Sequence, residues 1–196
     1  MAGATVTNNQ ATFATSGPYV NLPSGLFGSY TAMSVEAWVT TGVNSGYERI
    51  FQFGDSATSN VNSMLVSCGS GPQVFDFTWF VGNSVGTFFS TSVLFNSQTS
   101  LHLVATLSAG GYARLYINGA LEGTTSAVVN PIPQPNIFYI GKSFDGTSGL
   151  IGLVNEFRIW GGVLSATDIA TRYSQGPGEA MSGLSVCVIS YFLSPD

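Results

Sequence analysis

The chain has 196 residues, of which 44% are hydrophobic and only 8% are charged, and its formal net charge at pH 7 is -5. This length suits one domain with a sizeable core, and the low share of charged residues leaves the surface mainly to Ser, Thr, Asn, Gln and Gly. The cations are Arg49, Arg114, Lys142, Arg158 and Arg172. Since so few cations cannot form a basic patch, we expect no nucleic-acid binding by phosphate neutralisation.

The two ends of the sequence bear on its location. Residues 1–5 lack the basic start and apolar core of a signal peptide, so we expect a start after a removed signal or excision from a larger secreted protein or assembly. The apolar-rich stretch Leu184–Leu193 has about half the length that a membrane span needs, so we expect no membrane span. The low charge suits an extracellular or surface-exposed protein better than a cytosolic enzyme.

Cys68 and Cys187 are far apart in the sequence. They either form a disulfide across the fold or remain buried thiols, and the sequence leaves both alternatives open because it cannot place their Cβ atoms. Two cysteines are also too few for a metal-thiolate site without other ligands.

The first half of the chain predicts short strands separated by turns. Residues 1–10 are polar and predict a loose N-terminal arm, and Ala11–Leu22 predicts two short strands around Ser16–Pro18. Met33–Thr40 alternates, with Met33, Val35, Ala37 and Val39 on one face and Ser34, Glu36 and Trp38 on the other. Further strands are predicted at Glu48–Gly54, Ser63–Cys68 and Gln73–Val81, the last with Phe75, Phe77 and Trp79 on one face.

The second half begins with a predicted hairpin. Leu101–Leu107 and Tyr112–Asn118 flank the glycine-containing segment Ser108–Gly111, and the pair Asn118-Gly119 favours a tight turn. Asn130–Pro135 predicts a proline-rich loop, and Asn136–Gly141 predicts a strand.

The closing segment predicts a strand followed by a helix. Leu150–Trp160 alternates with apolar residues on both faces, which indicates a strand within a sandwich, and Gly161-Gly162 ends it. Ser165 can cap a short helix, with Asp168 at the capping-box position. Ile169 and Tyr173 would share one face of that helix. Gly183–Phe192 predicts a final strand.

This closing segment resembles the pattern G-x-I-D-E-V-R-I-(W/Y)-x-x-x-L-S-x-x-x-I of the LamG-like (concanavalin A-like) jelly-roll family, which includes laminin G-like and pentraxin-like domains. The matching residues are Gly152, Val154, Glu156, Arg158, Ile159, Trp160, Leu164, Ser165 and Ile169. The family's Asp is Asn155 here, and the Asp of its opening F-D-G motif is Ala14. The resemblance runs from about Phe13 to Phe192. It implies an all-β fold, an antiparallel two-sheet jelly-roll sandwich with one short helix near the C-terminus, as a single domain over residues 11–196.

The sequence argues against an enzyme. Glycosidases of this type of sandwich need paired carboxylates, commonly as E-x-D-x-x-E or E-x-D-x-E, and neither pattern occurs. His102 is the single histidine, and we expect it to be packed or hydrogen-bonded within its strand.

Calcium is the cofactor to consider, because it binds hard oxygen ligands. The resemblance implies ligands at Ala14 and Asn155, and the loss of both carboxylates predicts a weak site or none. Other candidate oxygen donors are Asp55, Asn60 and Asp145 in loops, where Asp also suits a solvated turn.

A carbohydrate site is predicted from aromatic and planar polar side chains. Tyr112, Arg114, Tyr116 and Asn118 share one strand face by alternation, and a register shift of one would add His102. Tyr47 and Phe144 in loops are equally good candidate contacts. The alternative is that tyrosine and arginine simply line a half-buried sheet face.

The resemblance implies a non-catalytic extracellular recognition or adhesion module that binds carbohydrate or a protein partner. The rival hypothesis is a self-assembling structural subunit of an extracellular filament, appendage or capsid-like surface. It rests on sheet edges poor in Lys and Glu and on the uncharged, β-rich segment Val85–Phe95. If those residues face the core instead, the segment gives no support to assembly.

Overall fold

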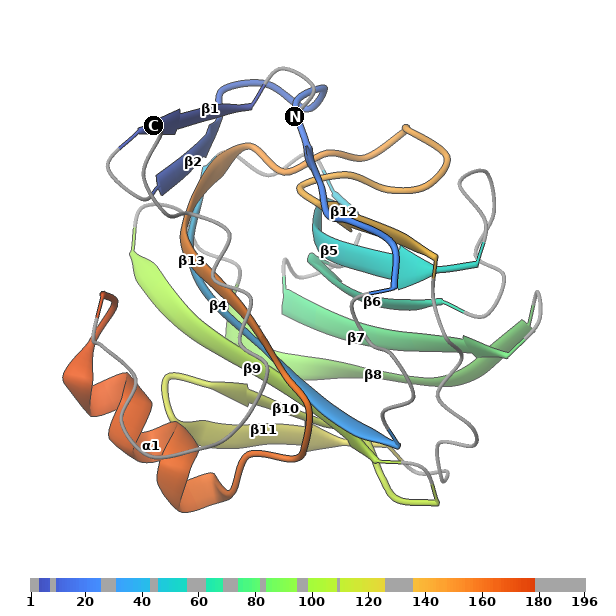
Figure 1. Ribbon diagram of the computed structural model, residues 1–196, viewed down its shortest axis with the longest axis vertical. Helices are drawn as coiled ribbons and strands as arrows, with labels where there is room; N and C mark the ends of the chain where they lie inside the picture. The colour runs from blue at the N-terminus through green and yellow to red at the C-terminus, as the bar shows by residue number, and fades with distance from the viewer. Residues whose placement is uncertain are drawn as a thin grey trace.

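Two antiparallel sheets build the molecule, as the sequence predicted (Figure 1). The computed structural model describes residues 4–7, 10–25, 31–42, 46–55, 63–68, 74–81, 84–94, 99–108, 110–125 and 136–178. The seven-stranded sheet has the order β1 (Thr5–Thr7), β2 (Gln10–Phe13), β13 (Gly152–Trp160), β4 (Ala32–Thr41), β9 (Ser100–Ser108), β10 (Arg114–Ile117), β11 (Ala120–Thr124). The six-stranded sheet has the order β3 (Val20–Asn21), β12 (Ile137–Ile140), β5 (Arg49–Gly54), β6 (Met64–Cys68), β7 (Val74–Val81), β8 (Ser84–Leu94).

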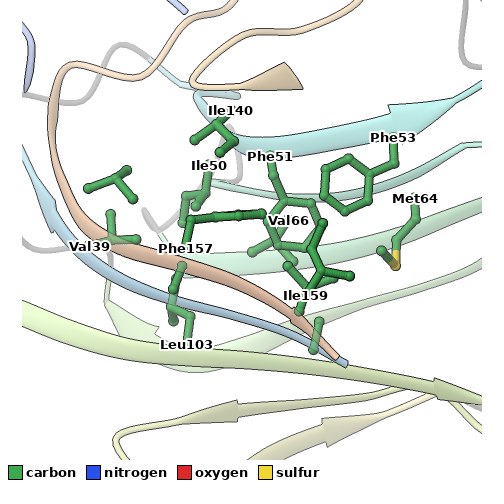
Figure 2. Packing of buried hydrophobic residues seen from close by; sticks show 14 of the residues in the cluster. Val39, Ile50, Phe51, Phe53, Met64, Val66, Leu103, Ile140, Phe157 and Ile159 are labelled. Carbon is green, nitrogen blue, oxygen red and sulfur yellow. The ribbon is translucent and has the colours of Figure 1, made fainter. Parts of the chain in front are cut away.

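The core lies between the two sheets and follows the alternation of the strands. In β4 the residues Met33, Val35, Ala37 and Val39 all face this core, as predicted. Figure 2 shows Phe51 and Phe53 of β5 meeting Phe157 of β13 across the sandwich. The ring of Phe157 lies edge-on to both, with centroids 5.9 and 6.2 Å away. Burying each such ring contributes about 1.5–3 kcal/mol, so these facing rings hold the sheets together.

Helix α1 (Ala166–Gln175) lies on the outer side of the seven-stranded sheet (Figure 1). Ser165 caps it as predicted, because its Oγ accepts the Asp168 N–H at 3.1 Å while the Asp168 carboxylate accepts the Ser165 N–H at 3.3 Å. The helix buries a second, smaller apolar cluster formed by Val104, Tyr116, Trp160, Leu164 and Ile169. Among the described residues, no helix is long and apolar enough to cross a membrane.

The predicted hairpin is confirmed, and the turn after it is tight. Strands β9 and β10 pair antiparallel around Ser108–Gly111. Asn118 and Gly119 then have φ values of 50° and 80°, which match the left-handed turn that an Asn-Gly pair favours between strands. This turn starts β11, a strand that the sequence pattern did not predict.

Part of the predicted loose arm is instead a strand. Thr5–Thr7 forms β1 and pairs with β2, with Thr5 opposite Thr12. Thr5 is exposed, which suits a strand at the edge of the sheet. The predicted loop Asn130–Pro135, the final strand Gly183–Phe192 and Cys187 lie outside the described residues, so the pairing of the cysteines stays open.

The uncharged segment predicted to favour assembly is mostly strand β8. This strand is an edge of the six-stranded sheet. It lies next to β11, an edge strand of the other sheet, where Ser92 Oγ lies 3.4 Å from the Glu122 carboxylate. Phe89 and Val93 pack against the core, whereas Val85 is 58% exposed. Phe89 and Val93 therefore serve the sandwich itself.

Candidate functional site

The outer face of the seven-stranded sheet holds a buried charged cluster beneath α1. Its centre is Glu36 of β4, which is 1% exposed. Glu36 Oε1 accepts a hydrogen bond from His102 Nε2 at 2.9 Å, and Oε2 accepts one from Trp160 Nε1 at 3.0 Å. Nη1 of Arg158 and Nη1 of Arg172 lie 3.6 and 3.8 Å from Oε2. We call these five residues the Glu36 cluster. It joins β4, β9, β13 and α1 through one carboxylate.

Aromatic contacts close the same interface. The guanidinium of Arg172 lies 4.0 Å above the ring of Trp160. Tyr173 stacks on both His102 and Trp38, with ring centroids 6.1 Å apart in each pair. Each cation–π contact contributes about 0.5–2 kcal/mol, depending on burial. Helix α1 is therefore fixed on the sheet by charge and by ring packing, and it covers this part of the face.

The charge of Glu36 is stabilised by its partners. Burial alone would raise the pKa of Glu36, but the hydrogen bond from His102 and the charges of Arg158, His102 and Arg172 outweigh it, so the pKa lies below its ordinary value of 4.5. Burial raises the pKa of Glu156, although Arg158 lies beside it. Because His102 is fully buried and hydrogen-bonded, its role is the packed strand histidine that the sequence predicted.

The predicted platform of Tyr112, Arg114, Tyr116 and Asn118 is not one open surface. Tyr116 is 7% exposed beneath α1, and Asn118 Oδ1 accepts the backbone N–H of His102 at 3.0 Å. Tyr112 is 44% exposed but precedes the strand, at the end away from α1. His102 shares the face of Arg114 and Tyr116 without any register shift, because these two residues pair with Thr106 and Val104.

A second group of polar side chains lies on the outer face of the six-stranded sheet. In β6, Val66 faces the core, so Ser67 faces outward. The register places Arg49 opposite Ser67, Ser67 opposite Asp76, and Asp76 opposite Ser90. This row crosses β5, β6, β7 and β8. It therefore brings together side chains that are up to 41 residues apart in the sequence.

The backbone carbonyl of Tyr47 and the charge of Asp145 both act on Arg49, at the β5 end of this row. Arg49 Nη1 donates a hydrogen bond to the backbone carbonyl of Tyr47 at 2.6 Å. Tyr47 has a left-handed φ of 57°, rare for a tyrosine, and its side chain is 52% exposed. We call Tyr47, Arg49, Asp76, Ser90 and Asp145 the Arg49 site. Strain held at an exposed aromatic residue is a feature often found where proteins bind ligands.

The Arg49 site combines buried and exposed charges. Burial lowers the pKa of Arg49, opposed by the charges of Asp145 and Asp76. Burial raises the pKa of Asp76, opposed by the Ser90 hydroxyl and by Arg49. Within the described part of the chain, the buried Asp76 Oδ1 and Arg49 Nε atoms have no hydrogen-bond partner. A buried polar atom left unpaired costs about 1–3 kcal/mol, so this arrangement lowers stability and is of the kind found at functional sites.

The Asp145 loop is held by its own hydrogen bonds. Asp145 Oδ1 accepts from Ser143 Oγ at 2.6 Å, from the Thr147 N–H at 3.0 Å and from Thr147 Oγ1 at 2.8 Å. Burial alone would raise the pKa of Asp145, but these hydrogen bonds and the charge of Arg49 lower it. Phe144, predicted as a loop contact, is 4% exposed, and its N–H donates to Gln52 Oε1 at 3.1 Å. Its ring packs inward and is closed to a ligand.

A family model described as the concanavalin A-like lectin/glucanases superfamily matches residues 14–170. The chain belongs to this superfamily. The resemblance seen in the closing segment is therefore confirmed over most of the sequence, although no curated protein matches it.

Solved structures of lectin-like and carbohydrate-binding domains share the fold. A heptameric SAP-like pentraxin from Limulus polyphemus is 18% identical, with a TM-score of 0.62 over 95% of this chain and 94% of that one. Domain 4 of AbnA, an extracellular arabinanase from Geobacillus stearothermophilus, in complex with arabinotriose, is 21% identical, with a TM-score of 0.60 over 86% and 75%. The CBM40 domain of a Ruminococcus gnavus IT-sialidase, bound to α2,3 sialyllactose, is 11% identical, with a TM-score of 0.59 over 72% and 82%. At these identities the likeness shows the fold alone, and it is a fold that binding modules use.

Two of the candidate calcium ligands already accept hydrogen bonds from other residues of the chain. Asn155 Oδ1 accepts a hydrogen bond from Gln10 Nε2, and Asp145 Oδ1 already accepts bonds within its loop. Asp55 is exposed after β5, and Asn60 lies outside the described residues. Within the described part of the chain, no group of three or more His, Cys, Asp or Glu side chains is placed to hold a metal. Weak or absent calcium binding stays a prediction.

Sequence reasoning missed three members of the Arg49 site. Arg49, Asp76 and Ser90 lie on separate strands, and only the pairing register brings them together. The signal available in the sequence was the alternation of β7, which places Asp76 on the other face of the strand from the core residues Phe75 and Phe77. A buried acid in a mostly apolar strand is costly unless it is paired and hydrogen-bonded, so Asp76 indicated a partner on a neighbouring strand.

Proposed function

We propose that this domain is a non-catalytic, extracellular binding module that holds a carbohydrate at the Arg49 site. The observation that carries the proposal is the exposed Tyr47 with its left-handed backbone, next to the charged groups of the Arg49 site. Helix α1 covers the part of the outer face of the seven-stranded sheet that holds the Glu36 cluster. On the six-stranded sheet, a strained and exposed tyrosine stands beside a guanidinium and two carboxylates.

The Arg49 site has the groups that sugar recognition needs. An exposed aromatic ring offers a face for the apolar side of a sugar ring, and planar charged groups donate to or accept from hydroxyls. Tyr47, Asp145 and Ser90 are exposed, while Arg49 is half-buried. Hydrolysis is not expected, because Asp145 Oδ1 is bound within its own loop and Asp76 is 6% exposed.

Binding to a glycan array, followed by calorimetric titration of the strongest glycan, tests the proposal. We expect Tyr47→Ala to weaken the affinity about tenfold, since it removes a stacking contact. The matched control is Tyr112→Ala, because Tyr112 is similarly exposed but belongs to the platform first predicted. If Tyr112→Ala weakened glycan binding and Tyr47→Ala did not, the carbohydrate site would lie on the seven-stranded sheet instead. The titrated glycan should be recovered uncleaved.

Self-assembly remains the rival hypothesis. The pentraxin neighbour is a heptamer, and β8 is an edge strand with Val85 exposed. Light scattering on the purified protein, measured with calcium and with a chelator, distinguishes a binding module from a self-assembling subunit. We expect a monomer whose mass and glycan affinity do not change on chelation. Filaments or closed shells without glycan affinity would make assembly the function, and assembly only with calcium would contradict the prediction of a weak metal site.

A further inference from the structure

The charge balance of the Arg49 site is negative. It contains one cation, Arg49, and two carboxylates, Asp76 and Asp145. The next cation in this region, Lys142, places its ammonium over the ring of Tyr19, 4.1 Å from the centroid, and near Tyr139. An anionic ligand would therefore meet two carboxylates held close to a single guanidinium. At short range such like-charge contacts disfavour the anion strongly.

Arg49 is also poorly placed to bind an anion through a bidentate hydrogen-bonded contact. Tight carboxylate or phosphate recognition by arginine uses two parallel N–H donors of one guanidinium. Here Nη1 already donates to the Tyr47 carbonyl at 2.6 Å, and Nε is buried. Among the described residues Arg49 forms no salt bridge. Its remaining donors suit a neutral acceptor such as a hydroxyl oxygen.

The exposed carboxylate supplies the complementary acceptor. The hydrogen bonds that fix Asp145 in its loop all go to Oδ1, and no described residue donates to Oδ2. An ionised carboxylate only accepts hydrogen bonds, so Oδ2 of the exposed Asp145 can accept one from a ligand in place of water. A sugar hydroxyl supplies a donor and an acceptor together, whereas the carboxylate of an acidic sugar supplies only acceptors at neutral pH.

We propose that the Arg49 site selects neutral, hydroxyl-rich saccharides and rejects acidic ones. Asp145 accepts from a sugar hydroxyl, Arg49 donates to a neighbouring oxygen, and Tyr47 packs against the sugar ring. Asp76 acts as a positioning residue, because its buried carboxylate holds a charge near Arg49 without being exposed. This inference rests on the proposed function and adds the class of ligand to it.

The test compares matched neutral and acidic glycans. The probes are a printed array of neutral, sialylated and sulfated glycans, then titration of the best neutral glycan and of its sialylated form. We expect the sialylated form to bind at least tenfold more weakly than the neutral form when its sialic acid reaches the site, which is a ratio of the two dissociation constants of at least about ten. Asp145→Asn, which keeps an acceptor in the loop, should reduce that ratio about threefold. The matched control is Asp168→Asn, which removes the same charge at the start of α1 and should leave the ratio unchanged.

The outcomes separate this inference from the function on which it rests. Binding to neither class would overturn the proposed function. Preferred binding of acidic glycans would overturn the neutral selection and leave carbohydrate binding intact. An unchanged ratio in Asp145→Asn, with neutral glycans still preferred, would overturn the assignment of selection to this carboxylate. For Asp76→Asn we expect weaker binding of neutral glycans with a shifted pH profile, whereas a purely structural role would lower stability alone.

Discussion

Replacing Glu36 by glutamine is expected to lower the free energy of unfolding by about 3 kcal/mol, because removing one partner of a buried charged group leaves the others uncompensated. Glu36 is 1% exposed and is the carboxylate that meets His102, Arg158 and Arg172. The glutamine keeps nearly the same shape, so the loss reports charge and hydrogen bonding. Urea unfolding followed by tryptophan fluorescence measures it.

Glu122→Gln is the matched control for this change. Glu122 is partly exposed on β11, and its described contact is a 3.4 Å approach to Ser92. A surface substitution of this kind changes stability by about 0.5 kcal/mol or less. Equal losses in the two variants would show that the Glu36 cluster does not fix α1. A larger loss in Glu36→Gln accompanied by faster hydrogen exchange in α1 would show that the carboxylate holds the helix on the sheet.

The difference in unfolding free energy between wild type and Glu36→Gln should also depend on pH, with a definite sign. Because the pKa of Glu36 in the folded protein lies below 4.5, the unfolded chain binds more protons at acidic pH. The stability from Glu36 is therefore fully present above about pH 4.5 and is lost as the pH falls through the lower folded pKa. The raised pKa of Asp76 acts in the opposite direction but remains in both proteins. The pKa of Glu156 is raised mainly by burial, which also remains, and only in small part by Glu36. The difference between wild type and Glu36→Gln should therefore shrink below about pH 4.5.

The sequence predicted most of the strands and the helix, but not which of their side chains are accessible to a ligand in the folded domain. Alternation in Met33–Thr40 sets the core face of β4 correctly, and Ser165 caps the helix as predicted, because both signals are local. Tyr116 looked available for a ligand because the pattern of its own strand cannot show that α1 packs on it. Arg49 and Asp76 were missed because only the pairing of distant strands makes them neighbours.

Replacing Gly141 by alanine is expected to lower the free energy of unfolding by about 3 kcal/mol. Gly141 follows β12 with a φ of +82°, a conformation that costs a non-glycine residue about 1 kcal/mol. A Cβ there would overlap Cε1 of the buried Phe13 ring and lie 2.7 Å from its Cδ1. The backbone cannot move aside, because the Gly141 N–H donates to Ile50 and its carbonyl accepts from Leu150, both at 2.9 Å. Overpacking of this kind adds about 1–3 kcal/mol.

Gly25→Ala separates backbone strain from the clash. Gly25 has nearly the same φ, +81°, and no described residue lies within 4 Å of an added Cβ, so we expect a loss of only about 1 kcal/mol. Urea unfolding of both variants gives the comparison, and a double-mutant cycle with Phe13→Ala isolates the ring contact. In the Phe13→Ala background, Gly141→Ala should cost little more than Gly25→Ala. A full loss in that background would mean that backbone strain, not Phe13, dictates glycine here, and the packing of β2 against the end of β12 would be looser than the structure shows.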